Sequence, residues 1–155
     1  MVIETKDYGL VHIDPEDIVT FPDGLYAFEE TKQFVLLNTG SKAGIMQLQA
    51  VDSIEPRFIL LDPCMFLEAY NPIMPEGVAL KLGDIDGKSL SFFVIAVIPE
   101  NIAVATVNLK SPVVINFKEK LGAQVILENE EYPVRYRLFN DERAGSNACY
   151  KQKAR

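Results

Sequence analysis

The chain has few of the residues that build covalent or metal-bound frameworks. Its 155 residues include two cysteines, one histidine and no tryptophan. Cys64 and Cys149 lie far apart, and no Cys or His residues stand at the spacing of zinc ligands. We therefore expect no metal and, in a reducing cytosol, no disulfide. Cys64 lies in an apolar run, where we expect a small buried hydrophobic residue.

The sequence also has no hydrophobic run long enough to cross a membrane. The longest, FFVIAVI at residues 92–98, is far too short to span a bilayer. The first nine residues, MVIETKDYG, carry acidic side chains and lack the apolar segment of a signal peptide. With 48% hydrophobic and 24% charged residues, the chain is expected to form a single soluble domain in the cytoplasm.

The chain contains residue types that can act in catalysis, but their positions in the sequence do not match those of known catalytic or metal-binding motifs. His12 lies within a strand-like segment without a serine or cysteine nearby, so we interpret it as a surface histidine on an edge strand. Asp84 and Asp86 resemble the beginning of a calcium loop, but the third ligand and distal glutamate are missing, which favours a surface turn. Adjacent carboxylates such as Glu29 and Glu30 point in different directions. We expect no enzyme, no catalytic residue and no cofactor.

The charge of the chain is acidic and unevenly distributed. Residues 140–155 hold four basic and two acidic side chains, so this tail carries +2. Because the whole chain carries −7, residues 1–139 carry −9. An acidic body argues against direct nucleic-acid binding, which needs a basic surface, and favours a basic protein partner. Solubility alone is an alternative explanation of the same charge.

Strand signals dominate the chain, and helical signals are weak. Short segments rich in Val, Ile and Phe are separated by Pro, Gly, Asn or Asp, at residues 1–6, 10–13, 17–21, 34–38, 44–51, 57–62, 89–98, 102–109, 112–117 and 123–129. Residues 118–124 are expected to form a hairpin turn with Gly122 at its exit. The three prolines within 62–76 leave room for a helical turn or two at most. We predict a mainly β fold for residues 1–139, a small antiparallel β-barrel or pseudobarrel with long loops and only short helical turns, followed by a flexible, polar, basic tail at 140–155.

Three proline-containing apolar segments stand out, at residues 22–28, 62–75 and 108–117. They are rich in side chains that are frequent at protein interfaces, chiefly Phe, Tyr and Met. Such residues can instead close the open end of a small barrel. Because several such segments occur together and catalytic chemistry is missing, we interpret them as favouring protein binding.

Three longer segments resemble one protein family. They are VIETKDYGLVHIDPEDIVTFPDGLYAFEETKQFVLL from residue 2, MQLQAVDSIEPRFILLDPCMFLEAY from residue 46, and ATVNLKSPVVINFKEKLGAQVILENEEYPVRYRLF from residue 105. The first is similar to an opening hairpin followed by F-x-x-G-[LI]-x-G-F-E, the third to N-L-x-A-P-[IV]-[IV]-[IV]-N followed by G-x-Q-x-[IV]-L. The chain thus resembles the flagellar assembly factor FliW family over most of residues 2–139.

The chain departs from this family pattern at a few positions. Tyr26-Ala27-Phe28 stands where the family usually has P-G-F, Ala50 where it has serine, and Ser111 where it has alanine. Because Ala27 replaces a glycine, a positive φ at this residue becomes less favourable.

The resemblance implies a non-enzymatic partner switch in the cytoplasm. Members of the family bind flagellin near its C-terminal region and also bind CsrA, an RNA-binding translational repressor. The two partners compete, so that export of flagellin frees the factor to antagonise CsrA and flagellin synthesis resumes. The family binds CsrA away from its RNA groove. We expect no direct nucleic-acid contact, no membrane and a monomer.

The candidate site residues fall into two groups. Expected partner contacts are Leu25, Tyr26, Gln47, Gln49, Asp52, Tyr70 and Asn71, with the glutamines and Asp52 at a strand edge. Expected structural residues are Phe21, Gly24, Phe28, Asn108, Pro112 and Asn116. Two alternatives remain open at this point. One is a β-barrel enzyme that binds a small ligand such as a flavin, and the other is a homo-oligomeric structural module.

Overall fold

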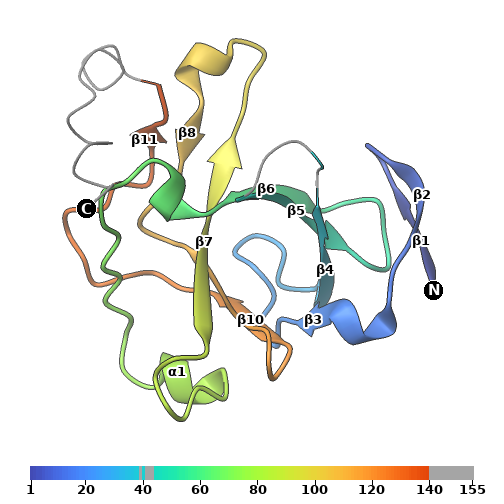
Figure 1. The fold of residues 1–155 in the computed structure, drawn as a ribbon, viewed down its shortest axis with the longest axis horizontal. Coiled ribbons are helices and arrows are strands. Elements are labelled where there is room, and N and C mark those ends of the chain that lie inside the picture. The colour runs from blue at the N-terminus through green and yellow to red at the C-terminus, as the bar shows by residue number, and fades with distance from the viewer. Residues whose placement is uncertain (39, 41–43, 140–155) are drawn as a thin grey trace.

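The computed structural model describes residues 1–38, 40 and 44–139 of the chain (Figure 1). Its strands are β1 (Val2–Thr5), β2 (Gly9–His12), β3 (Ile18–Thr20), β4 (Gln33–Asn38), β5 (Ile45–Ala50), β6 (Arg57–Leu61), β7 (Leu90–Val97), β8 (Thr106–Val107), β9 (Val113–Asn116), β10 (Leu121–Gln124) and β11 (Tyr136–Arg137). The helical elements are short: α1 (Val78–Lys81) and the 3-10 turns η1 (Pro15–Asp17), η2 (Pro63–Met65) and η3 (Ile102–Val104). None of the helices in the described residues is long and apolar enough to cross a membrane.

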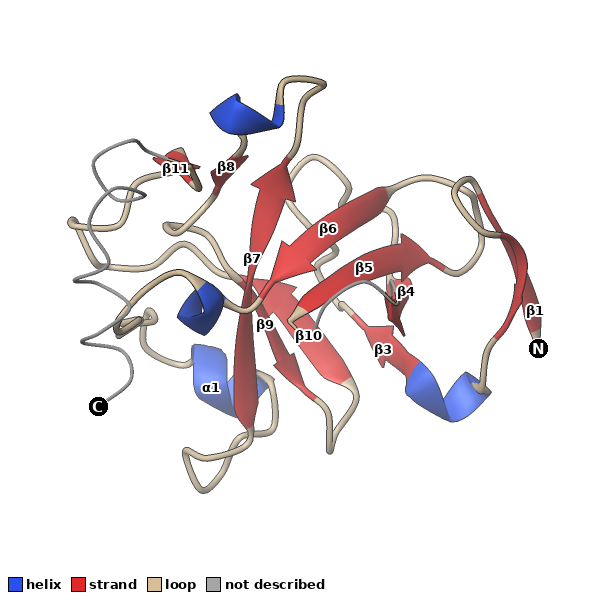
Figure 2. Cartoon of the chain, turned by 45° about the horizontal axis from the view of Figure 1, so that its top comes forward, coloured by secondary structure: helices blue, strands red, loops and turns tan. Residues whose placement is uncertain are grey.

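Seven strands close into a barrel. Strands β3 to β7 follow one another as antiparallel neighbours, and β7 also pairs with β9, which pairs with β10. The ring is completed by a short parallel contact between Thr20 of β3 and Leu121 of β10. Strands β8 and β11 extend the sheet outward from β7, and the β1–β2 hairpin lies to one side of the barrel (Figures 1 and 2).

The centre of the barrel is filled by side chains. Phe21, Phe34, Leu48, Leu60 and Ile115 are completely buried there, and the rings of Phe21 and Phe34 meet edge to face at 5.2 Å. The interior is therefore a packed core.

A smaller core attaches the β1–β2 hairpin to the outer face of the barrel. Ile3 of the hairpin is buried against Val35 of β4 and against Val51, which directly follows β5. This packing explains why a two-stranded ribbon, which is marginal by itself, is held in place.

The structure confirms the predicted fold class and corrects several details. The strand predicted at 123–129 and the turn predicted at 118–124 are both displaced, since β10 spans Leu121–Gln124. Gly122 therefore lies inside a strand, where the ring of Phe21 comes so close that an added Cβ would be 2.5 Å from its Cζ. The prediction that Cys64 is buried is wrong: it is exposed at the 3-10 turn η2. Cys149 and the tail 140–155 lie outside the described residues.

Candidate protein interface

The loop after β3 folds back onto the barrel and separates buried from exposed side chains. Phe21 and Leu25 are buried in the main core, with 1% of Leu25 exposed, whereas 51% of Tyr26 is exposed. Gly24 has a φ of 65°, and an added Cβ would lie 2.6 Å from backbone atoms of the returning chain. The structure thus places Leu25 inside the fold, contrary to its expected exposure, and leaves Tyr26 on the surface.

A tight turn from Leu25 to Phe28 fixes the exposed tip of this loop. The Phe28 N–H donates to the Leu25 carbonyl at 2.8 Å, and Ala27 has a φ of 72°. A positive φ at the third residue alone is the geometry of a type II turn, which favours proline at the second position and glycine at the third. The usual P-G of the family pattern suits this turn, and the chain keeps its geometry with Tyr26 and Ala27. Phe28 lies partly exposed, with its ring edge to face on Phe58 at 5.4 Å.

The expectation that Gln47 and Gln49 lie at a strand edge is wrong. Strand β5 is paired on both sides, by β4 and by β6, and the exposed fractions of the two side chains are 4% and 0%. Gln47 Nε2 donates to Gln49 Oε1 at 2.9 Å, and Gln49 Nε2 lies 3.2 Å from the carbonyls of Ala50, Ser53 and Ile54. Gln49 therefore holds the loop after β5 against the sheet.

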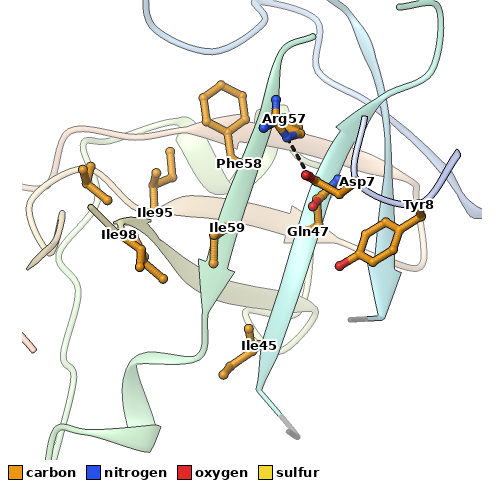
Figure 3. Close-up of a pocket in the computed structure, with 11 residues that line it drawn as sticks. Asp7, Tyr8, Ile45, Gln47, Arg57, Phe58, Ile59, Ile95 and Ile98 are labelled. Atoms are coloured by element: carbon orange, nitrogen blue, oxygen red, sulfur yellow. Dashed lines mark hydrogen bonds and ion pairs between the residues drawn. The ribbon is translucent and has the colours of Figure 1, made fainter. Parts of the chain in front are cut away.

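A groove of about 670 Å³ lies between the tip of the β1–β2 hairpin and strands β5–β7 (Figure 3). Its wall is mainly apolar and includes Ile59 and Ile98, while Gln47 contributes a buried amide. Asp7 of the hairpin pairs with Arg57 of β6 at 2.7 Å on one bank, and this bond raises the pKa of the guanidinium. The pair ties the hairpin to the barrel beside the groove. Asp52, by contrast, is exposed beside a separate depression that Glu30 and Lys32 also line.

A polar clamp fixes the loop that contains Tyr70 and Asn71. The rings of Tyr70 and Tyr132 contact each other at a tilt of 36°, with their centroids 4.8 Å apart. Tyr70 Oη donates to the Leu109 carbonyl, and burial raises the pKa of the Tyr70 phenol. The buried side chain of Asn129 accepts from Ile73 N–H and donates to the Asn71 carbonyl, at 2.7 and 2.9 Å. Tyr70 is thus half-buried and fixed in this clamp, whereas Asn71 is exposed.

The candidates expected to be structural sit in turns or in the core. Asn108 Oδ1 accepts from Ser111 N–H, and the buried Pro112 follows. Asn116 is completely buried, where Oδ1 accepts from two backbone N–H groups of the next turn and Nδ2 donates to the Leu82 carbonyl. These contacts bind the β9–β10 turn to the chain beyond α1.

Titratable groups in the described residues do not converge on a reaction centre. No group of three or more His, Cys, Asp or Glu residues in that part of the chain could hold a metal ion. His12 lies exposed at the end of β2. Asp86 accepts from Lys88 N–H, which lowers the pKa of its carboxyl, and the neighbouring Asp84 accepts from Ser89 N–H. Both carboxylates accept hydrogen bonds within their own turn, as expected for a turn, but Asp84 is buried and not at the surface.

Sequence reasoning missed an exposed apolar surface on the connection between β7 and β8. Val97, Ile98, Ile102 and Val104 are all exposed there. The run FFVIAVI at residues 92–98 was the sequence signal for this surface, because its last two residues, Val97 and Ile98, extend beyond the core. Exposed apolar side chains gathered on one connection are typical of surfaces that bind another protein.

Comparisons with known proteins agree with this description. The sequence profile of the family described as FliW protein matches residues 2–138. The flagellar assembly factor FliW of Thermoanaerobacter pseudethanolicus is 34% identical over 152 residues, 96% of this chain and 100% of that protein. The FliW of Leptospira interrogans is 32% identical over 138 residues, 88% of this chain and 92% of that protein. A crystal structure of the flagellar assembly factor FliW superposes with a TM-score of 0.83 at 33% identity, covering 90% of this chain and 98% of that one. The chain belongs to the FliW family of flagellar assembly factors.

Proposed function

We propose that this flagellar assembly factor binds flagellin in the cytoplasm and, when free of it, binds and antagonises CsrA. The observation that carries the proposal is the family match, which spans residues 2–138 and almost the full length of proteins named flagellar assembly factors. Binding of each partner excludes the other, so the level of free flagellin sets how much CsrA is captured. The protein acts by binding and performs no catalysis.

The distribution of charge supports a basic partner. Residues 1–62 hold eleven acidic and four basic side chains, a net charge of −7, whereas residues 63–139 carry −2. A repressor that binds RNA needs basic residues, and an acidic surface attracts such a protein over a distance of about one Debye length, roughly 10 Å at moderate salt. The half of the chain that contains β1 to β6 is therefore the half that we propose to attract CsrA.

The apolar surface supports flagellin as the second partner. Tyr26, Ile98 and Ile102 are large side chains that remain exposed, although the core of the protein is already filled. Ile98 and Ile102 lie on the connection between β7 and β8. An amphipathic segment that lacks its final packing partners can cover such surfaces. The competing proposal of a flavin-type barrel enzyme is disfavoured, because side chains such as Phe34 and Leu60 occupy the centre of the barrel.

Isothermal titration calorimetry with purified flagellin and purified CsrA tests the proposal. We expect each protein to bind the chain stoichiometrically, and we expect CsrA affinity to decrease with salt. Absence of heat with both proteins, confirmed by co-elution, would overturn the proposed function.

A further inference from the structure

Strand β10 is fully paired on one side only. The N–H groups of Val125 and Leu127 donate to the carbonyls of Pro112 and Lys110, at 3.0 and 2.9 Å, which continues the β9–β10 ladder past Gln124. In an antiparallel pair, alternate residues direct their backbone groups to the same neighbour. Gln124 and Ile126 therefore direct their N–H and C=O groups away from β9.

The chain itself covers the other side of β10 only at its two ends. At the first end, Thr20 N–H donates to the Lys120 carbonyl at 2.9 Å, but the chain then reaches Pro22, which has no N–H to continue the ladder. At the second end, Glu128 N–H donates to the Ile73 carbonyl at 2.8 Å. Between these points, no backbone group of the described chain pairs with the outward groups of Gln124 and Ile126.

This open edge forms one wall of a groove of about 480 Å³. Pro22, Tyr26, Pro75 and Val78 line this groove, and Ile126, with 51% of its surface exposed, belongs to the edge itself. The position of Tyr26 is fixed, since Tyr26 N–H donates to Gln124 Oε1 at 3.1 Å and Gln124 Nε2 donates to the Ser111 carbonyl. The groove is thus a preformed slot beside a strand edge.

The residues of the edge lack the features that normally prevent strand addition. Residues 122–126 read GAQVI, without a charge or a proline. Proteins usually protect an exposed edge with Lys, Pro or a bulge, because unpaired N–H and C=O groups recruit another strand. Asp23 and Lys81 both line the groove, and their charges cancel. An uncharged, apolar extended segment matches this slot better than a basic one does.

We infer that the edge at residues 122–126 binds a short extended segment of flagellin, which adds to the barrel as a strand beside β10. This inference rests on the proposed function and names where one of the two partners binds. Backbone hydrogen bonds from Gln124 and Ile126 supply the pairing, and Tyr26 and Val78 contact the side chains of the added strand. CsrA, drawn to the acidic half of the chain, binds without using these backbone groups.

Replacement of Ile126 tests the inference, because its N–H points away from β9. Ile126→Pro removes that donor and leaves the β9 ladder intact, and Ile126→Ala is the matched control that shortens the side chain but keeps the N–H. We expect Ile126→Pro to bind flagellin roughly tenfold more weakly than Ile126→Ala does, the loss expected for one backbone hydrogen bond at an interface. CsrA affinity and unfolding temperature should be the same for both variants.

Amide hydrogen exchange followed by NMR supplies a second readout with an internal control. In the free chain, the amides of Val125 and Leu127 should exchange slowly and those of Gln124 and Ile126 fast. Addition of flagellin should slow the exchange of Gln124 and Ile126. If these two amides are already slow in the free chain, the tail or a second copy occupies the edge and the inference is overturned.

The outcomes separate this inference from the proposed function. Equal flagellin affinities of Ile126→Pro and Ile126→Ala, or a loss confined to CsrA, would overturn strand addition while leaving the partner switch in place. A wild-type chain that binds neither protein overturns the proposed function, and the inference with it.

Discussion

Ala27 should be a position at which glycine stabilises the protein. Its φ of 72° lies in the left-handed region, which costs an L-residue about 1–2 kcal/mol. Glycine removes that cost, but it also lowers stability by about 0.4–1 kcal/mol, because it increases the conformational entropy of the unfolded chain. The expected net gain for Ala27→Gly is therefore about 0.5–1 kcal/mol, which corresponds to a rise in Tm of roughly 1–4 °C for a protein of this size.

Thermal unfolding and urea titration of Ala27→Gly measure this gain directly. Ala103→Gly is the matched control, because Ala103 is exposed in the 3-10 turn η3, where glycine should destabilise by about 0.5–1 kcal/mol. Opposite signs for the two variants support the type II turn from Leu25 to Phe28. A loss of stability in Ala27→Gly equal to that in Ala103→Gly would refute the left-handed geometry.

Three further predictions follow from packing and charge. Gly122→Ala should lower the free energy of unfolding by about 1–3 kcal/mol, because the new Cβ would overlap the ring of Phe21. An unchanged midpoint of the urea titration would contradict this packing. Asn129→Ala should lower the free energy of unfolding by about 2–4 kcal/mol, since it leaves two backbone groups of the 71–73 loop unpaired. A loss below about 0.5 kcal/mol, the size expected for a surface substitution, would mean that water replaces the Asn129 side chain. Glu29→Gln with Glu30→Gln should slow association with CsrA in stopped-flow measurements at low salt and have little effect at high salt, and an effect independent of salt would argue against steering.

Local patterns located most of the barrel strands because short β-branched and aromatic segments are separated by turn residues, although the predicted strand at 102–109 begins with the 3-10 turn η3. The hairpin of β1 and β2 around Asp7-Tyr8-Gly9 follows from turn residues between two apolar segments, and the structure confirms it. The closure of the barrel does not follow from such patterns. It depends on the pairing of Thr20 with Leu121, residues far apart in sequence that join through one short parallel contact.

Burial of the candidate site residues was harder to predict than the strands. Gln47 and Gln49 alternate with apolar neighbours, which resembles a solvated face, yet both are buried: the loop after β5 uses the Gln49 amide as its anchor, and Gln47 donates a hydrogen bond to Gln49. Leu25 follows an Asp-Gly turn, a position typical of the surface, but the chain reverses again at Phe28 and carries Leu25 into the core. In both places the packing of other segments around the residue decides its burial, and the local residue pattern contains no direct signal for that packing.

A competition titration tests the central claim most directly. The chain is first saturated with flagellin and then titrated with CsrA in the calorimeter, with a CsrA titration of the free chain as the reference. We predict that flagellin weakens the apparent affinity for CsrA in proportion to the flagellin concentration, and that CsrA releases flagellin from the complex on size-exclusion chromatography. A stable complex of all three proteins, with CsrA affinity unchanged by flagellin, would contradict it.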